Sequence, residues 1–403
     1  MSSTWKVYFL ALVSFLVGTS EYVISGVLDK ISDSMAISIT AAGQLVTIFS
    51  LVYGLCTPVT MALTSKLDRK NLLVGALGIF ILANVMSFAL PGFGLFIISR
   101  VIMALGAGVV VVTALDIAAK IAPAGKQASS IATVVMGFTA SLIIGVPLGR
   151  MAAAEYGWRS VFGFIALAGL VAVFVLFYTI PRIKGDAPVP LTKQLALLKN
   201  KKVAVGLSIT LFWLGGYSIA YTYISPYLLN VAGVNEGMLS GVLLAFGIAS
   251  LIGSKTGGYS TDKWGVSSTL LGGMTVHFAA LILLSLAIAV SANMFVVAAL
   301  LILWSFSAWS TGPTQQYNLV RIKPEYSGIM LGLNQSMLQL AMAAGAGIGA
   351  IAVEQVSLSS ITWFGAIGVA IAILAALSLN SMMKEGKGAR QTYQGVQEQP
   401  VQE

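Results

Sequence analysis

A carboxylate lies in the middle of a long hydrophobic stretch near the start of the chain. Glu21 is inside Trp5–Leu28, and apart from Lys6 no residue of this stretch before Glu21 is charged. An ionisable group in hydrocarbon is costly unless a partner or a pathway uses it. Glu21 is therefore either a protonated structural residue, hydrogen-bonded between helices, or a carboxylate that takes up and releases a proton or another cation.

The neighbours of Glu21 favour the second interpretation. Ser14, Gly18, Glu21 and Ser25 are spaced by four, three and four residues, so they share one face of a helix. Such a face of small and polar residues suits a water-accessible cavity or a close helix contact. A carboxylate there can hold a proton when desolvated and release it when hydrated. We expect Glu21 to carry a coupling proton.

Two further charged residues occupy the fourth hydrophobic stretch. The guanidinium of Arg100 stays charged and needs a partner or backbone carbonyls, either as a clamp between helices or for proton transfer. Asp116 follows 16 residues later, about 24 Å along a straight helix, so the two cannot touch. Asp116 and Lys120 are spaced as an i,i+4 pair, which is the first interpretation of Asp116; cation coupling is the second.

Uncharged polar and aromatic residues complete the candidates, because such groups around a cavity suit a partly apolar, hydrogen-bonding solute. The predicted cavity set is Tyr22, Trp213, Tyr217, Tyr221, Trp304, Thr311, Gln315, Asn334, Gln335 and Gln339. The alternative is that the aromatic residues anchor the helices at the membrane surface and the amides join helices. His277 is interpreted as a helix-packing residue.

Composition identifies the elements that position these residues. Apolar residues make up 57% of the 403-residue chain and charged residues 9%, whereas soluble domains carry about 25% charged residues. The hydrophobic runs are continuous and lack the alternation of barrel strands, so we predict an all-α integral membrane protein. The twelve predicted spans are 5–28, 41–63, 72–90, 94–119, 128–153, 159–180, 203–230, 237–259, 268–290, 293–318, 327–352 and 358–382.

The longest polar interruption divides the spans six and six. We predict an N-terminal six-helix bundle over 1–180, a cytoplasmic linker over 181–202, a second bundle over 203–383 and a disordered cytoplasmic tail over 384–403. With the N-terminus in the cytoplasm, only four of the 23 basic residues, Lys30, Arg100, Arg150 and Arg159, fall outside the cytoplasmic segments and their helix ends. This bias predicts that both termini are cytoplasmic.

Several function classes are disfavoured. Cys56 is the only cysteine and His277 the only histidine, so neither an intrachain disulfide nor a Cys/His metal site is expected. No Walker sequence and no H-E-x-x-H sequence is present, which argues against ATP-driven export by this chain and against an enzyme. The basic residues lie in short loops, so no nucleic-acid partner is expected, and no cofactor is expected either.

The two halves repeat a charged turn, at Thr64–Lys70 after the second span and at Gly258–Gly265 after the eighth. The second turn resembles the signature of the major facilitator superfamily. In the first, Met61 and Ser65 stand where that family has glycine and aspartate. The resemblance implies gating or structural roles for Asp68, Arg69, Gly258, Asp262 and Gly265.

Other segments extend the resemblance over all twelve spans. Arg100 followed by Gly106-Ala107-Gly108 is similar to the family's arginine motif, although Met103 and Ala104 depart from it. Gly145, Pro147 and Gly149 resemble the motif of the drug:proton antiporter branch; physically, they predict a kink and a close helix contact. Stretches around Glu21, Pro226, Gln315 and Gln335 look like arabinose- and purine-efflux permeases.

The resemblance implies a fold and a function. It implies two pseudo-symmetric six-helix bundles, monomeric in the inner membrane, that alternate access to a central cavity. Proton entry would drive export of a small organic solute: a nucleobase or nucleoside, a sugar, or an amphipathic drug as in multidrug resistance. A proton-coupled importer of the same fold is the main alternative, and a multi-span membrane enzyme is a distant one.

Overall fold

The computed structural model describes residues 3–122, 127–185, 192, 196–290 and 293–397, and in these residues the secondary structure is helical. Twelve of the helical segments are long and apolar enough to cross a membrane, as predicted. In the first half the helices are α1 (Ser3–Gly26), α2 (Leu28–Met35), α3 (Ile39–Leu63), α4 (Arg69–Ala89), α5 (Phe93–Ile121), α6 (Gln127–Ala140), the π-helical turn η1 (Ser141–Gly145), α7 (Val146–Tyr156) and α8 (Trp158–Thr179). In the second half they are α10 (Lys201–Tyr221), α11 (Ile224–Asn230), α12 (Glu236–Trp264), α13 (Val266–Ala289), α14 (Met294–Ile322), α15 (Ser327–Gln355) and α16 (Ile361–Gln397), with 3-10 turns at Pro324–Tyr326 and Leu358–Ser360.

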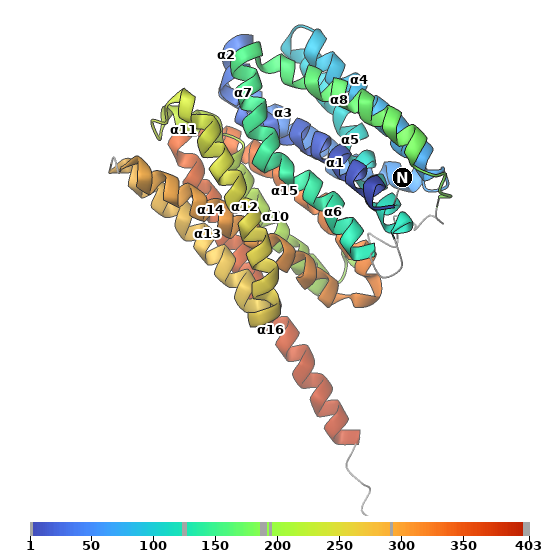
Figure 1. Ribbon diagram of the computed structural model, residues 1–403. Helices are drawn as coiled ribbons and strands as arrows, with labels where there is room; N and C mark the ends of the chain where they lie inside the picture. The colour runs from blue at the N-terminus through green and yellow to red at the C-terminus, as the bar shows by residue number, and fades with distance from the viewer. Residues whose placement is uncertain (1–2, 123–126, 186–191, 193–195, 291–292, 398–403) are drawn as a thin grey trace, which may run out of the picture.

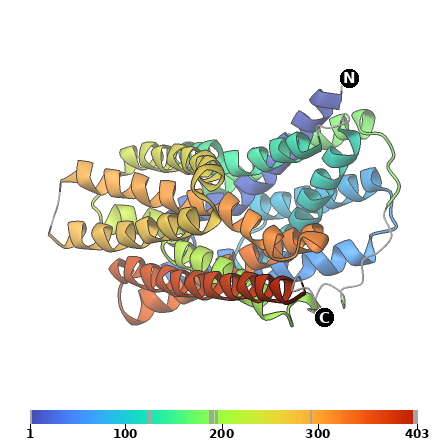
Figure 2. The same cartoon turned by 90° about the horizontal axis from the view of Figure 1, so that it is seen from below.

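The two halves use the same helix pairings, which is the expected six-plus-six repeat. In the first half α1 packs against α6, α3 and α4 pack against α5, and α4 packs against α8. The second half repeats these pairs as α10 with α15, α12 and α13 with α14, and α13 with α16. Figure 1 shows the halves as a blue-to-green group and a yellow-to-red group. Seen from below, the start of α1 and the last turns of α16 lie toward the same end (Figure 2).

Short polar residues begin many of these helices. The side chains of Ser38, Asp68, Asn200, Asn235 and Asn293 accept hydrogen bonds from backbone N–H groups in the first turns of α3, α4, α10, α12 and α14. Such caps satisfy donors that a helix leaves unpaired at its start. Asp68 therefore has a local structural role in addition to its place in the motif.

Three boundaries differ from the sequence prediction. The seventh span is α10 alone and ends at Tyr221, because a break at Thr222–Tyr223 separates it from the short helix α11. The predicted turn Gly258–Gly265 is wrong: α12 stays helical to Trp264, with the Thr261 hydroxyl bonded to the Gly257 carbonyl, and only Gly265 leaves the helix, at φ +82°. The backbone of α16 continues as a helix to Gln397, beyond the start of the predicted tail.

The fifth span bends where its proline motif predicted. Pro147 has no N–H to donate, and the preceding residues Ser141–Gly145 form a π-helical turn between α6 and α7. Glycines let α1 approach this region closely. A Cβ added at Gly145 would lie 2.2 Å from the Thr19 hydroxyl, and one at Gly149 would lie 2.3 Å from Val23. The segment therefore provides a tight seam with α1.

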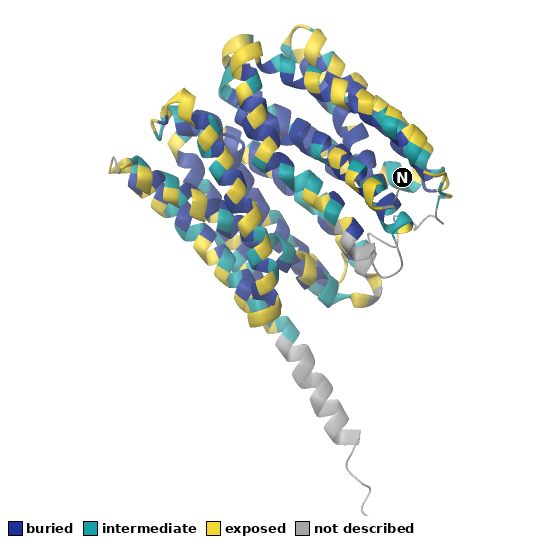
Figure 3. Cartoon of the chain, in the orientation of Figure 1, coloured by how far each residue is buried: buried dark blue, intermediate teal, exposed yellow. Residues whose placement is uncertain are grey.

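The two ends of the bundle differ in composition. One, which we call the α2/α11 end, holds α2, α11, the end of α7 and the start of α12. The other, the linker end, holds residues 64–68, 180–185, 196–200 and 264–265; there the Arg69 N–H bonds the Ile183 carbonyl. Lys126 and Lys193, counted above among the basic residues, lie outside the described residues. Exposed residues, yellow in Figure 3, run along the outer helix faces. Many of them are large and apolar, as a lipid-facing surface requires.

The close seam gives a stability prediction. In Gly137→Ala the added Cβ would lie 2.1 Å from the Ala11 carbonyl oxygen, so α6 and α1 must separate at a cost of about 1–3 kcal/mol. In the control Gly75→Ala, in α4, the added Cβ meets nothing within 4 Å. Thermal unfolding of the purified variants should show a lower midpoint for the first and an unchanged or slightly higher one for the second. Equal unfolding midpoints for the two variants would contradict the close contact between α6 and α1.

Candidate functional site

Glu21 lies where the two halves meet. Its side chain comes from α1, the residue is 3% exposed, and its Oε1 accepts a 3.1 Å hydrogen bond from Nε2 of Gln339 on α15. The second oxygen, Oε2, has no hydrogen-bond partner among the described residues. One oxygen of the buried carboxylate is thus held by the opposite half, and the other is free to take a proton or a ligand.

Arg100 is fully buried beside this carboxylate. Its Nη1 donates to the carbonyl of Ser20 at 2.8 Å and contacts the sulfur of Met103 at 3.3 Å, while the guanidinium lies 4.2 Å from the ring centre of Phe49. Its Nε and Nη2 have no partner in the described part of the chain. The clamp predicted as one of two roles is present, since Arg100 on α5 grips the α1 backbone directly before Glu21.

Further buried polar atoms lie on α3, which packs against α15. Ser50 and Tyr53 share a face of α3, and neither hydroxyl has a partner in the described structure. The next residue, Gly54, lies against Gln339: a Cβ added to Gly54 would be 3.0 Å from the Gln339 Cβ. Gln335 is half-buried on α15. We call Glu21, Ser50, Tyr53, Arg100 and Gln339 the central polar cluster. Buried polar groups are normally paired, so this concentration indicates a place that hydrogen-bonds water or a solute.

An aromatic wall borders the cluster from the second half. We define it as Tyr217, Tyr221, Phe246 and Trp304. Tyr217 and Tyr221 stack with ring centres 5.0 Å apart and planes 16° apart, and Phe246 meets Trp304 edge-on at 5.0 Å. Tyr22 of α1 touches this wall through Tyr221, at 6.4 Å between ring centres. Of the predicted aromatic residues of span 7, Tyr221 contacts the first half, and Tyr217 stacks on Tyr221 within the second half.

Two ring N–H groups of the second half lack acceptors. Nε2 of His277 accepts a 3.0 Å bond from Nε1 of Trp304, so a neutral His277 carries its proton on Nδ1. Neither His277 Nδ1 nor Trp213 Nε1 has a partner among the described residues. His277 was expected to be a satisfied packing residue, but it is only half satisfied.

Other predicted cavity residues belong to a separate network inside the second half. Gln315 donates to the Gly206 carbonyl at 2.7 Å and to the Thr210 hydroxyl at 2.9 Å, and Thr210 donates to Asn334 at 2.8 Å. Thr311 bonds back to the Ser307 carbonyl of its own helix, at 3.2 Å. These contacts join α10, α14 and α15, which is the interhelical role left open above as the alternative.

Asp116 also lies apart from the central polar cluster. Its Oδ2 is 2.8 Å from Arg69 Nε and 3.1 Å from Lys120 Nζ, toward the linker end. The i,i+4 pair with Lys120 is confirmed, and Arg69 adds a bridge from α4 to α5. In the second half a hydroxyl contact, 2.7 Å between Thr261 and Thr314, joins α12 to α14.

Sequence reasoning did not foresee a charged cluster that joins the halves at the α2/α11 end. The side chain of Arg150 is almost fully buried, bonds Asp29, and contacts Glu236 at 3.5 Å; Glu236 in turn pairs with Lys30 at 2.6 Å. Ser225 donates to Asp29 at 2.6 Å. The partners come from α2, α7, α11 and α12, so no local spacing shows them; the only signal is a charged pair, Asp29-Lys30, after the first span.

The chain is similar to known membrane transport proteins over most of its length. Residues 10–346 match the model of the Major Facilitator Superfamily. The chain is 67% identical over 386 residues to the "Uncharacterized MFS-type transporter YbcL" of Bacillus subtilis, covering 96% of this chain and 98% of that one. It is 29% identical to the "Inner membrane transport protein YdhP" of Escherichia coli K12, covering 93% and 95%.

Solved structures share the fold. A D-xylose-proton symporter superposes with a TM-score of 0.77 at 17% identity, covering 94% of this chain and 97% of that one. A bacterial homologue of the lysosomal transporter Spinster, described as inward-facing and unoccupied, gives 0.73 at 16% identity, covering 94% and 98%.

The Arg100 clamp can be tested by stability. Arg100→Lys should lower the unfolding free energy by about 1–3 kcal/mol, because an ammonium cannot both bond the Ser20 carbonyl and lie flat on the Phe49 ring. The exposed Arg182→Lys serves as control. Thermal unfolding in detergent measures both, and a midpoint unchanged by Arg100→Lys would show that the clamp contributes nothing.

Proposed function

Because the chain belongs to the Major Facilitator Superfamily, we propose that this transporter is a proton-coupled exporter of a small organic solute. Glu21 is the proton site in this proposal, and alternating access moves the solute between the two halves. The observation that carries the proposal is the position of Glu21: buried at the junction of the halves, with one oxygen bonded across the junction and the other unpaired.

That position links protonation to movement of the halves. A rearrangement that separates α1 from α15 breaks the bond between Gln339 and Glu21. An ionised carboxylate that loses its donor inside hydrocarbon is costly, whereas a protonated one is not. Movement away from the present arrangement is therefore easier once Glu21 has taken a proton, and this couples protonation to the change of access.

Arg100 supports the ionised state of Glu21 in this scheme. Its guanidinium stays charged, is held by the Ser20 carbonyl and the Phe49 ring, and keeps two N–H sites unpaired. A positive charge near the carboxylate favours release of the proton. Arg100 thus positions α1 and opposes permanent protonation of Glu21, and we assign no proton to Arg100 itself.

The solute binds between the central polar cluster and the aromatic wall. The cluster offers acceptors at Glu21 and Gln339 and donors at Tyr53 and Arg100, and the wall offers ring faces. Both sides favour a compact organic solute with an apolar face and hydrogen-bonding edges. Nucleobases or nucleosides, sugars and amphipathic drugs are the classes to be screened.

We assign the linker end to the cytoplasm, because bases gather there. The described ones include Lys66, Arg69, Lys70, Lys120, Arg182, Lys184, Lys199, Lys201, Lys202, Lys263, Arg321 and Lys323. The α2/α11 end then faces outward. Contacts between the halves at and beyond Glu21 toward this outer end include Tyr22 with Tyr221 and Lys30 with Glu236, and α3 packs along α15. In our proposal this arrangement receives solute from the cytoplasm.

Glu21→Gln tests the coupling. The amide is isosteric with the protonated acid but cannot titrate, so efflux driven by a pH gradient in proteoliposomes should fall by about tenfold or more. Solute exchange without a gradient needs no net proton movement and should be affected less. The control is Glu354→Gln, an exposed carboxylate near the end of α15, which should leave gradient-driven efflux unchanged. Full gradient-driven efflux with an unchanged pH dependence would make Glu21 structural, and Asp116 the next carboxylate to examine.

Orientation is tested by labelling single cysteines in a Cys56→Ala background. An impermeant thiol reagent applied to intact cells should label Asp33→Cys, exposed at the α2/α11 end, but not Lys199→Cys, exposed in the linker. Permeabilised cells should show label at both positions. The reverse pattern in intact cells would invert the topology and, with it, the assignment of export.

A further inference from the structure

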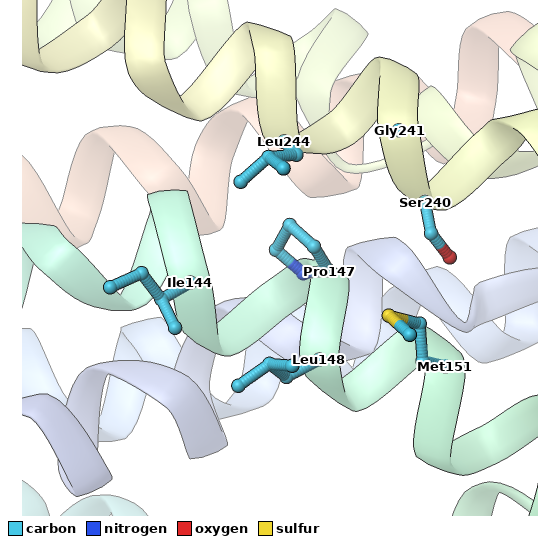
Figure 4. A pocket seen from close by; sticks show the side chains of 7 residues that line it. All are labelled: Ile144, Pro147, Leu148, Met151, Ser240, Gly241 and Leu244. Atoms are coloured by element: carbon cyan, nitrogen blue, oxygen red, sulfur yellow. The ribbon is translucent and has the colours of Figure 1, made fainter.

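An apolar groove opens on the seam between the two halves, away from the central polar cluster. It has a volume of about 240 Å³ and is lined by Ile144, Pro147, Leu148, Met151, Ser240, Gly241 and Leu244. One wall is η1 and α7 of the first half and the other is α12 of the second (Figure 4). The proposed transport mechanism makes no use of it.

The side chains that line the groove are open to the surroundings of the protein. Exposed fractions are 47% for Ile144, 54% for Leu148, 57% for Met151 and 40% for Leu244. All four belong to membrane-spanning helices. The medium against this surface is therefore hydrocarbon, and an apolar occupant is the only kind that leaves no polar group unpaired there.

The depth of the groove matches the upper part of a lipid tail. Ser240 and Leu244 lie four and eight residues after Glu236, where α12 begins, which is roughly 6–12 Å along the helix. On the other wall, Met151 lies five residues before Tyr156, where α7 ends, or roughly 8 Å. Both walls thus place the groove just below the polar surface of the membrane.

We propose that the groove binds one acyl chain of a membrane phospholipid, which packs against both halves at once. The π-helical turn and Pro147 shape one wall, and Gly241 leaves the other without a side chain; a Cβ at Gly241 would meet nothing within 4 Å. The volume exceeds the roughly 150 Å³ of an apolar cavity known to bind benzene. A flexible methylene chain restores the dispersion contacts that the groove's walls otherwise lack.

An acyl chain in this position connects lipid to conformation. The groove lies between α7 and α12, directly below the ion pairs of Arg150 and Lys30 with Glu236. A chain that touches both walls favours the arrangement in which the walls are this close. It acts as a removable part of the contact between the halves, and it does so whether the protein exports or imports its solute.

A photoreactive phospholipid with a diazirine in the middle of one acyl chain tests the proposal. The full-length protein is reconstituted in bilayers that contain it, irradiated, digested and mapped by mass spectrometry. Label should concentrate on residues 144–151 and 240–244. Gly241→Leu places an apolar side chain in the groove from a position where an added Cβ meets nothing within 4 Å, and it should reduce that label by more than half. Leu148→Trp, which fills it from the opposite wall, should do the same.

The matched control is Gly78→Leu, another exposed helical glycine whose added Cβ meets nothing within 4 Å. It should leave the label on the groove unchanged, and all variants should unfold near the wild-type temperature. Label spread evenly over the lipid-facing helices would overturn the proposal, as would label at the groove that neither filling variant reduces. A groove labelled by a small membrane-dissolved diazirine but not by the phospholipid would also overturn it, and would indicate an apolar solute instead.

Discussion

A buried guanidinium needs hydrogen-bond acceptors, and in this protein α1 supplies a backbone carbonyl to each of two arginines. Arg100 from α5 donates to the Ser20 carbonyl, and Arg150 from α7 donates to the Gly26 carbonyl. Neither arginine can give up its charge in hydrocarbon, so neither can leave these acceptors at low cost. α1 is therefore fixed to the rest of its own half on both sides of Glu21. The two arginine bonds thereby set the position of the carboxylate.

The same helix is held by shape as well as by charge. Gly137, Gly145 and Gly149 of the fifth span let α1 approach closely. On α1, Gly18 contributes to the same contact, because a Cβ added to it would lie 2.5 Å from the Ser141 hydroxyl oxygen. Packing and interhelical bonds drive association in a membrane, because lipid is as apolar as leucine. The π-helical turn lies in this seam, and its other side forms the groove against α12. One local distortion thus shapes an inner contact and an outer surface.

How much of the structure could be predicted from the sequence depends on how far apart along the chain the interacting residues lie. Hydrocarbon thickness fixes span length, so the twelve spans and their repeat were predictable. The pair of Asp116 with Lys120 was predictable because a helix brings i and i+4 together. The bond from Gln339 to Glu21 joins residues 318 apart, and only packing of the halves reveals it. Amides were the least certain: Gln339 reaches Glu21, whereas Gln315 serves its own half, and nothing in their local sequences distinguishes them.

The charged cluster at the α2/α11 end divides unequally between the halves. Asp29, Lys30 and Arg150 belong to the first half and together carry one positive charge, and Glu236 in the second half carries one negative charge. Parting the halves at this end separates two opposite net charges and admits water between them. Dissolved ions weaken such an attraction over about 8 Å at physiological ionic strength. The balance between the closed and open arrangements therefore depends on the salinity of the compartment that this end faces, a variable distinct from pH and from the solute.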